Sequence, residues 1–227
     1  MTHLLYLRPA RFNVPEDFKL PDRFVFHHHG FDPHASVPAL TMPYLLDRPK
    51  IEFHRRPLLF IDMEFTGLDT AKHEIIEIAA LLVSQPDLSI VNSYYTKVTP
   101  EHVRTADPKS LQVSGYLPKA WARAISLRQA LIELSRFAPG CLLAGWSIQT
   151  EWDFLNFALE KEQLPYFYDH HLLEVYTLAF AKYFRLGKLN FLNLQSVARD
   201  LGIAIDRHKP DSDIRATYEI FKRLISS

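Results

Sequence analysis

The sequence has very little cysteine. Cys141 is the only one among 227 residues, so no disulfide can form within the chain. The N-terminal residues also lack the apolar stretch and small-residue cleavage site of a secretory signal. Because disulfides are typical of oxidising compartments, the single thiol favours a reducing one. We expect a cytoplasmic location.

Long apolar runs and an excess of one charge are lacking as well. The longest apolar runs, such as residues 58–61 and 78–83, are the length of a strand and far shorter than the roughly 20 residues that span a bilayer. The 26 basic and 26 acidic residues balance, which argues against a broad basic face that coats duplex nucleic acid. An enzyme that holds one strand end through bound cations does not need such a face.

The composition changes near residue 57. Residues 1–56 show little periodicity, and we expect a mostly irregular, proline-rich N-terminal extension before a folded domain at 57–227. The extension is more apolar than a disordered tail, so it would pack on the domain or on a second subunit of a homodimer. The run at His27–His29 has no further ligands at metal spacing, which favours a solvated loop over a metal site. The prolines of the extension are at positions 9, 15, 21, 33, 38, 43 and 49.

From Pro57 onward the pattern of apolar residues becomes regular. Three strands are predicted first, and alternating helices and strands follow. This order predicts an α/β fold with a mixed sheet flanked by helices. The predicted strands are 58–63, 75–83, 90–98, 141–146 and a short one near 166–168; the predicted helices are 126–137, with Ser126 as N-cap, and about 150–163, 171–185, 193–201 and 211–224.

Two acids stand at the end of the first predicted strand. Asp62 and Glu64 are two residues apart, so on a strand their carboxylates project from the same face. Paired hard oxygen ligands suit Mg²⁺ or Mn²⁺. An isolated Asp-x-Glu is usually a solvated pair, but an acid directly after LLFI lies where burial penalises an unpaired charge. The pattern therefore indicates a divalent-cation site.

The whole segment LLFIDMEFTGLDTAKHEIIEIAALLV, residues 58–83, resembles the first motif of the DEDDh exonucleases, the family of oligoribonuclease and of the proofreading subunit of bacterial DNA polymerase III. The resemblance implies an RNase H-like fold with a mixed five-stranded sheet. It also implies that Thr66, Gly67 and Leu68 form the turn that contacts the terminal nucleotide. Glycine suits that place because it lets the backbone approach a ligand closely.

A second segment, RHKPDSDIRATYEIF at 207–221, resembles the third motif of the family. His208 and Asp213 occupy the positions of the general base and of a metal ligand. A histidine suits a base at neutral pH because its ordinary pKa is near 6.5. Asp211 is an alternative ligand by proximity, although its place near a helix start favours a cap.

The middle motif departs from the family pattern. In AGWSIQTEWDFLNFAL, residues 144–159, a gapless register places Glu151 on the metal-binding aspartate of the family, while Trp146 and Ser147 replace a His-Asn pair. A rival register offers Asp153. The two acids are two apart on a helix and point in different directions, so only one can face the site. The gapless register favours Glu151, whose longer side chain would require the site to adjust.

Together the motifs imply a 3′-5′ exonuclease on single-stranded DNA or RNA, or on short oligonucleotides, that releases 5′ nucleoside monophosphates. Two Mg²⁺ or Mn²⁺ ions would be held by Asp62, Glu64, Glu151 and Asp213, with His208 as base. Phe65 would stack on a terminal base or belong to the core. Lys72, Arg185, Lys188 and Arg215 would contact phosphates or be ordinary solvated charges.

Two other functions fit the same residues. The altered middle motif is compatible with a nucleic-acid-binding or protein-interaction module that keeps the fold and has lost turnover. A phosphodiesterase acting on a small nucleotide or dinucleotide would share the chemistry and differ in the depth of its pocket.

Overall fold

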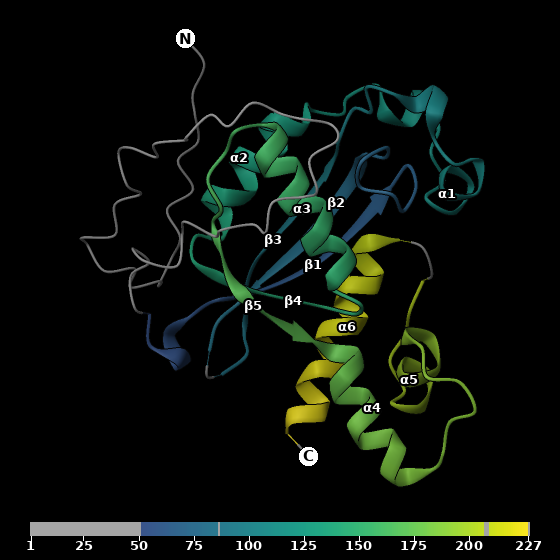
Figure 1. Ribbon diagram of the computed structural model, residues 1–227. Coiled ribbons are helices and arrows are strands. Elements are labelled where there is room, and N and C mark those ends of the chain that lie inside the picture. The colour runs from purple at the N-terminus through teal and green to yellow at the C-terminus, as the bar shows by residue number, and fades with distance from the viewer. Residues whose placement is uncertain (1–50, 86, 207–208, 227) are drawn as a thin grey trace, which may run out of the picture. The chain divides into compact units, whose positions relative to one another are not determined.

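The computed structural model describes residues 51–85, 87–206 and 209–226, and the predicted extension falls almost entirely outside these ranges. Its centre is a five-stranded sheet with the order β3-β2-β1-β4-β5 (Figure 1). β1 pairs antiparallel with β2 and parallel with β4, so the sheet is mixed, as predicted. The strands are β1 (Leu58–Phe65), β2 (Ile75–Val83), β3 (Ile90–Lys97), β4 (Cys141–Gly145) and β5 (Tyr168–Glu174).

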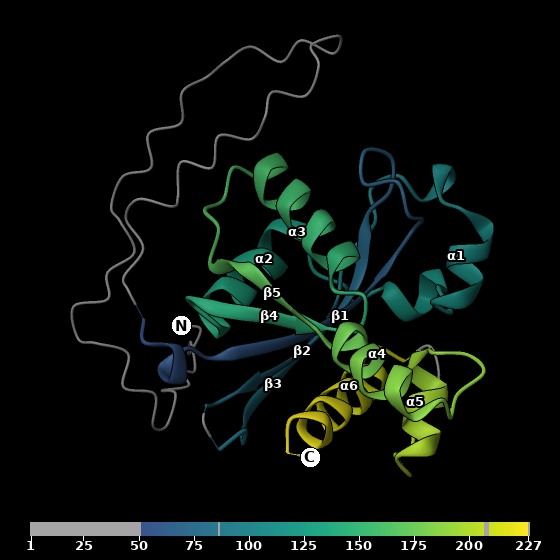
Figure 2. The same cartoon turned by 60° about the horizontal axis from the view of Figure 1, so that its bottom comes forward.

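Helices cover both faces of the sheet (Figures 1 and 2). One apolar cluster joins the sheet to α2 and α3, and a second joins the opposite face to α4, α5 and α6. No described helix has both the length and the hydropathy that crossing a bilayer requires. The helices are α1 (Pro108–Val113), α2 (Leu127–Phe137), α3 (Gln149–Lys161), α4 (Val175–Leu186), α5 (Leu194–Asp200) and α6 (Pro210–Ile225), with short 3-10 turns at Phe53–Arg55, Val103–Thr105 and Pro118–Trp121.

The alternation of side chains along β1 decides which residues meet which helix. Phe60 points to the face covered by α6, where its ring contacts Tyr218 and Phe221 at centroid distances of 5.6 and 5.3 Å. Asp62 and Glu64 follow at two-residue steps and therefore project from that same face. β1 thus delivers both acids to the end of the sheet under the first turn of α6.

Most predicted elements match the structure to within a few residues. Ile75–Val83 is a strand with all nine residues buried, and Ser126 caps α2 by accepting a hydrogen bond from Gln129 N–H at 3.2 Å. The last strand was predicted too early and too short, and the helix after it was predicted to begin four residues too soon. Tyr168–Glu174 forms β5, although a helix was predicted from residue 171. The strand forms because it pairs parallel with β4, and the polar sequence YDHHLLE gives no local sign of that pairing.

Candidate active site

Asp62 and Glu64 lie partly buried at the end of β1. Asp213 lies in the first turn of α6, the helix that packs over this face of the sheet. Burial raises the pKa of both β1 acids first, and the charge of Asp213 adds to it, as expected for carboxylates at the same end of the sheet. The structure therefore brings Asp213 to the end of β1 from 149 residues beyond Glu64 in the sequence.

Glu151 comes to the same place from the first turn of α3. Only 7% of it is exposed, and its Oε2 atom has no hydrogen-bond donor among the described residues. Phe154 and Leu155, one turn further along, are buried in the core at 2% and 0% exposure. Asp153 points outward, where it is exposed and accepts a hydrogen bond from Gln149 Nε2 at 2.9 Å. The helix thus turns Glu151 inward and Asp153 outward.

Burial and mutual repulsion raise the pKa values of these acids. Burial is the first cause at Asp62, whose pKa is well above its usual range, and the charges of Glu151, Asp213 and Glu64 add to it. Burial, followed by the charges of Glu77 and Asp213, raises the pKa of Glu64 to about 7. The charged forms are therefore disfavoured, and these acids hold their protons to a higher pH than free carboxyl groups do.

Glu151 shows the same effect more strongly. Burial raises its pKa to about 8, and the charges of Glu174 and Glu64 contribute. No three of the candidate acids bring their oxygen atoms within 4.8 Å of one another. Hard oxygen donors in this number suit Mg²⁺ or Mn²⁺, which would satisfy the buried Oε2 of Glu151.

Two further acids, which the sequence analysis did not assign to the site, support it. Glu77 is the register partner of Glu64 and accepts a hydrogen bond from the Tyr95 hydroxyl. It is the one charged residue of β2, a nine-residue strand that is buried throughout. A single acid in such an apolar run was the sequence signal that could have indicated its place near the site.

Glu174 holds the loop between β4 and α3. Its carboxylate accepts hydrogen bonds from the N–H groups of Ser147 at 2.9 Å and Ile148 at 3.0 Å, and from that of Tyr176 at 2.9 Å. Ser147 has a φ of 62°, a left-handed conformation that a non-glycine residue seldom adopts. Gly145 begins this loop, and a Cβ there would lie 2.8 Å from Ile148 Cδ1. Glu174 therefore fixes the entry to α3 and the position of Glu151.

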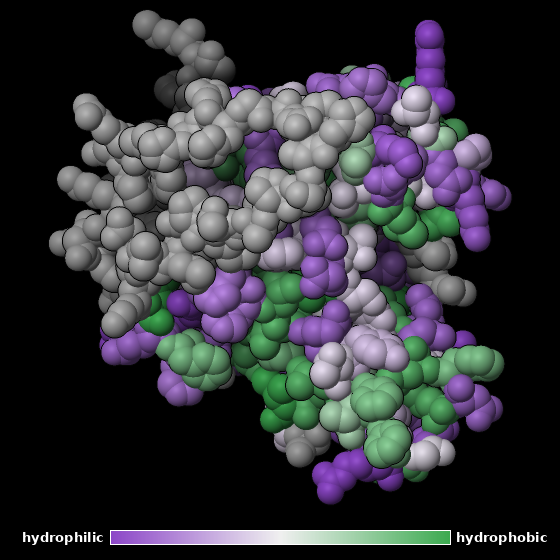
Figure 3. Space-filling model, viewed as in Figure 1, coloured by the Kyte–Doolittle hydropathy of each residue, from purple (hydrophilic) through white to green (hydrophobic). Residues whose placement is uncertain are grey.

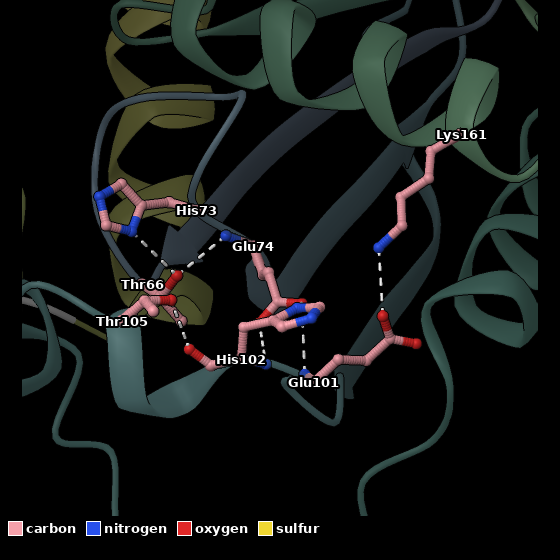
Figure 4. Close-up of polar contacts among 7 residues, drawn as sticks. All are labelled: Thr66, His73, Glu74, Glu101, His102, Thr105 and Lys161. Carbon is pink, nitrogen blue, oxygen red and sulfur yellow. Dashed lines mark hydrogen bonds and ion pairs between the residues drawn. The ribbon is translucent and has the colours of Figure 1, made fainter.

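The turn after β1 is held rigidly. Thr66 is buried. Its N–H donates to the Glu74 carbonyl at 2.9 Å, and its hydroxyl oxygen accepts from the Glu74 N–H at 2.9 Å, the bond that Figure 4 shows. A Cβ on Gly67 would lie 2.4 Å from the ring of His73, so a larger residue here would require that ring to move. Leu68 is 79% exposed. The turn thus combines a fixed backbone with an apolar side chain that faces water.

Glu74 links this turn to the segment after β3 (Figure 4). Its carboxylate accepts hydrogen bonds from the N–H groups of Glu101 at 3.2 Å and His102 at 2.9 Å, and lies 3.1 Å from His102 Nδ1. Lys161 of α3 reaches Glu101 at 3.2 Å. Although Glu74, Glu101 and His102 have metal-binding side chains close together, these protein donors already engage Glu74, so we interpret the group as a structural link.

Another group of possible metal ligands lies on β5 and is separate from the acids at the end of β1. Asp169, His170 and His171 have ligand atoms within 4.8 Å of one another. Asp169 is paired with Arg56 and accepts hydrogen bonds from His171, so its charge is balanced by the protein. This differs from the acids at the end of β1, whose strongest neighbours are other acids.

The remaining predicted site residues have mixed outcomes. Phe65 lies in the core, stacked on Phe154 at a centroid distance of 3.9 Å, in agreement with the core alternative. Asp211 is not the N-cap of α6, because the helix begins one residue earlier at Pro210; it pairs with Arg215 at 3.2 Å instead. Lys72 pairs with Asp69 at 2.7 Å. His208 lies outside the described residues.

Acids gathered at the end of a central strand, with further acids from two helices, define a candidate phosphodiester hydrolase. The family model RNase_T, described as Exonuclease, matches residues 59–221. The chain belongs to this exonuclease family.

The chain is 28% identical over 179 residues to a PolC-type DNA polymerase III from Thermotoga petrophila, covering 76% of this chain and 12% of that protein. It is 34% identical over 112 residues to an oligoribonuclease from Corynebacterium diphtheriae, covering 44% and 53%. The chain therefore spans only part of each relative.

The nuclease domain of 3′hExo, a DEDDh family member solved with bound rAMP, superposes with a TM-score of 0.60 at 19% identity, over 75% of this chain and 92% of that one. That likeness confirms the predicted RNase H-like fold.

Proposed function

We propose that the chain is a metal-dependent 3′-5′ exonuclease that hydrolyses single-stranded nucleic acid or short oligonucleotides to 5′ nucleoside monophosphates. The observation that carries this proposal is that Asp62 and Glu64 at the end of β1 are joined by Glu151, which is buried with its Oε2 lacking a described donor. The raised pKa values of these three acids agree with it. Strongly shifted acids in one place favour a functional site over an incidental surface cluster. Membership of the exonuclease family supports the same reaction.

In this proposal Asp62, Glu64, Glu151 and Asp213 hold two Mg²⁺ or Mn²⁺ ions. The buried Oε2 of Glu151, which has no described donor, supports the assignment. When bound, such ions activate water and stabilise charge on the leaving 3′ oxygen. Glu174 positions the residues that lead into Glu151, and so helps to fix the shape of the ligand set.

The remaining roles concern the proton and the strand end. His208 accepts the proton of the attacking water, which its ordinary pKa near 6.5 allows at neutral pH. The turn at Thr66, Gly67 and Leu68 receives the terminal nucleotide. Support comes from its fixed backbone and from Leu68, whose exposed side chain offers an apolar surface to a base. A cytoplasmic location remains part of the proposal.

The test uses purified protein with single-stranded RNA and DNA oligomers labelled at the 5′ end, each with Mg²⁺, Mn²⁺ or EDTA. We expect a ladder of shortened, still labelled products with either ion and none in EDTA. Products that lose the 5′ label first would contradict the polarity. Binding without any cleavage would instead support the inactive module, and cleavage of dinucleotides alone would support the small-nucleotide phosphodiesterase.

A further inference from the structure

The outer face of α4 carries aromatic side chains at four-residue intervals. Tyr176, Phe180 and Phe184 are 38%, 49% and 76% exposed. The rings of Phe180 and Phe184 are stacked on each other, with centroids 5.6 Å apart and planes 24° apart. Figure 3 shows hydrophobic residues gathered on this side of the molecule, over the region of α4. A row of exposed rings is unusual enough to indicate a binding surface.

This row begins beside the candidate active site. Trp146, which follows β4, meets the ring of Tyr176 edge to face at 5.7 Å. Glu174, the N-cap of α4, bonds the N–H groups of Ser147 and Ile148 in the loop that leads to Glu151. From there α4 extends away from the sheet (Figures 1 and 2). The aromatic face is therefore continuous with the surface around the carboxylates.

The charge of the same segment is of one sign. Residues 175–193 contain Lys182, Arg185 and Lys188 and no acidic residue, although the whole chain has equal numbers of basic and acidic residues. Arg185 and Lys188 are exposed, and neither forms an ion pair with a residue that the structure describes. Exposed rings beside unopposed cations complement a flexible polyanion whose bases can stack.

We propose that Tyr176, Phe180 and Phe184, flanked by Arg185 and Lys188, form a stacking track for the bases of a single strand whose 3′ end lies among the carboxylates. This rests on the proposed function. Four residues of helix advance about 6 Å, close to the repeat of one extended nucleotide, so successive rings can meet successive bases. Every base has a flat face, so binding along the track is independent of sequence.

The test measures binding of a fluorescent oligothymidylate of about twelve nucleotides in EDTA, where no cleavage intervenes. We expect the double variant Phe180→Ala/Phe184→Ala to bind roughly a hundredfold more weakly, about tenfold for each ring removed. The loss should grow with strand length and be small for a dinucleotide, which is too short to reach far along α4. The matched control is Phe157→Ala, a similarly exposed ring (42%) on α3 that should bind as the wild type does.

A second variant tests the charge. Arg185→Gln should lower the slope of log affinity against log salt by about 0.7 for the phosphate contact removed. Unchanged affinity in the aromatic variant would overturn the proposal, as would an equal loss in Phe157→Ala. If the wild type is a dimer, and the aromatic variant is a monomer with unchanged oligonucleotide affinity, the aromatic face would instead be the contact with a second copy of the chain. Binding is measured without cleavage, so the two proposals can fail separately. If the protein does not cleave but its binding still depends on Phe180 and Phe184, the proposed function is wrong and the stacking track is supported.

Discussion

The carboxylate cluster and the aromatic face of α4 are neighbours with opposite chemistry. At the cluster, Asp62, Glu64 and Glu151 are withdrawn from water and have raised pKa values. On α4, Phe180 and Phe184 are exposed, and the flanking charges are basic. When ionised and without cations, the acids would repel a polyanion, whereas the basic residues beside α4 attract it whether or not cations are bound. Holding the strand and cutting it are therefore separable properties.

The largest expected effect separates the two regions completely. Asp62→Ala should reduce cleavage by roughly a thousandfold or more, because several kcal/mol of charge stabilisation at the reacting phosphate is lost. Oligonucleotide affinity in EDTA should remain, and the melting temperature should not fall, since like-charge repulsion is relieved. Cleavage assays, binding titrations and thermal melts measure the three quantities. Wild-type turnover in this variant would remove Asp62 from the site.

A smaller effect is expected at the general base. His208→Ala should slow single-turnover cleavage by about a hundredfold, since general-base catalysis contributes about that much or more. Neither Mn²⁺ binding nor oligonucleotide binding should change, because the residue contacts neither in this account. An unchanged cleavage rate would assign the proton transfer to another group.

The pH dependence of stability gives the smallest effect and sharpens the comparison. In the folded protein the pKa values of Glu64 and Glu151 are about 7 and about 8, against an ordinary 4.5. Between these limits the folded state holds more protons than the unfolded state, so the free energy of unfolding should fall as pH rises from about 4.5 to about 8.

Thermal melts in EDTA across this range measure that fall. Added Mn²⁺ should oppose it at the upper end, because the ion binds the deprotonated acids. Glu151→Gln should flatten the profile, and Phe180→Ala/Phe184→Ala should leave its shape unaltered. A flat wild-type profile would show that the acids are not as poorly solvated as their burial indicates.

The sequence predicted the elements whose signal is local. β2 is an uninterrupted apolar run and is buried throughout, and α2 begins at its serine cap. β5 was predicted too early and too short, because its pairing comes from β4 and a polar strand at the edge of a sheet carries no clear period. α1 was missed because its six residues are too few to show a helical period.

The candidate site likewise contains residues with a local sequence signal and residues placed by contacts distant in the sequence. Asp62 and Glu64 could be predicted as candidates because they are acids at the end of a buried strand. Glu151 needed the family resemblance to choose between two registers, and its inward orientation depends on the packing of Phe154 and Leu155. The supporting bonds were not predictable. Glu174 reaches back 27 residues to Ser147, and Glu74 reaches 28 residues forward to His102, distances at which sequence gives no signal.

The most direct test of the central claim compares two neighbours on one helix. Glu151→Gln keeps the shape of the side chain and removes its charge, and Asp153→Asn does the same on the outward face of α3. We predict that Glu151→Gln binds fewer Mn²⁺ ions in a calorimetric titration and loses most metal-dependent cleavage, while Asp153→Asn matches the wild type in both. Equal behaviour of the two variants, or loss in Asp153→Asn alone, would contradict the assignment of Glu151 as a metal ligand.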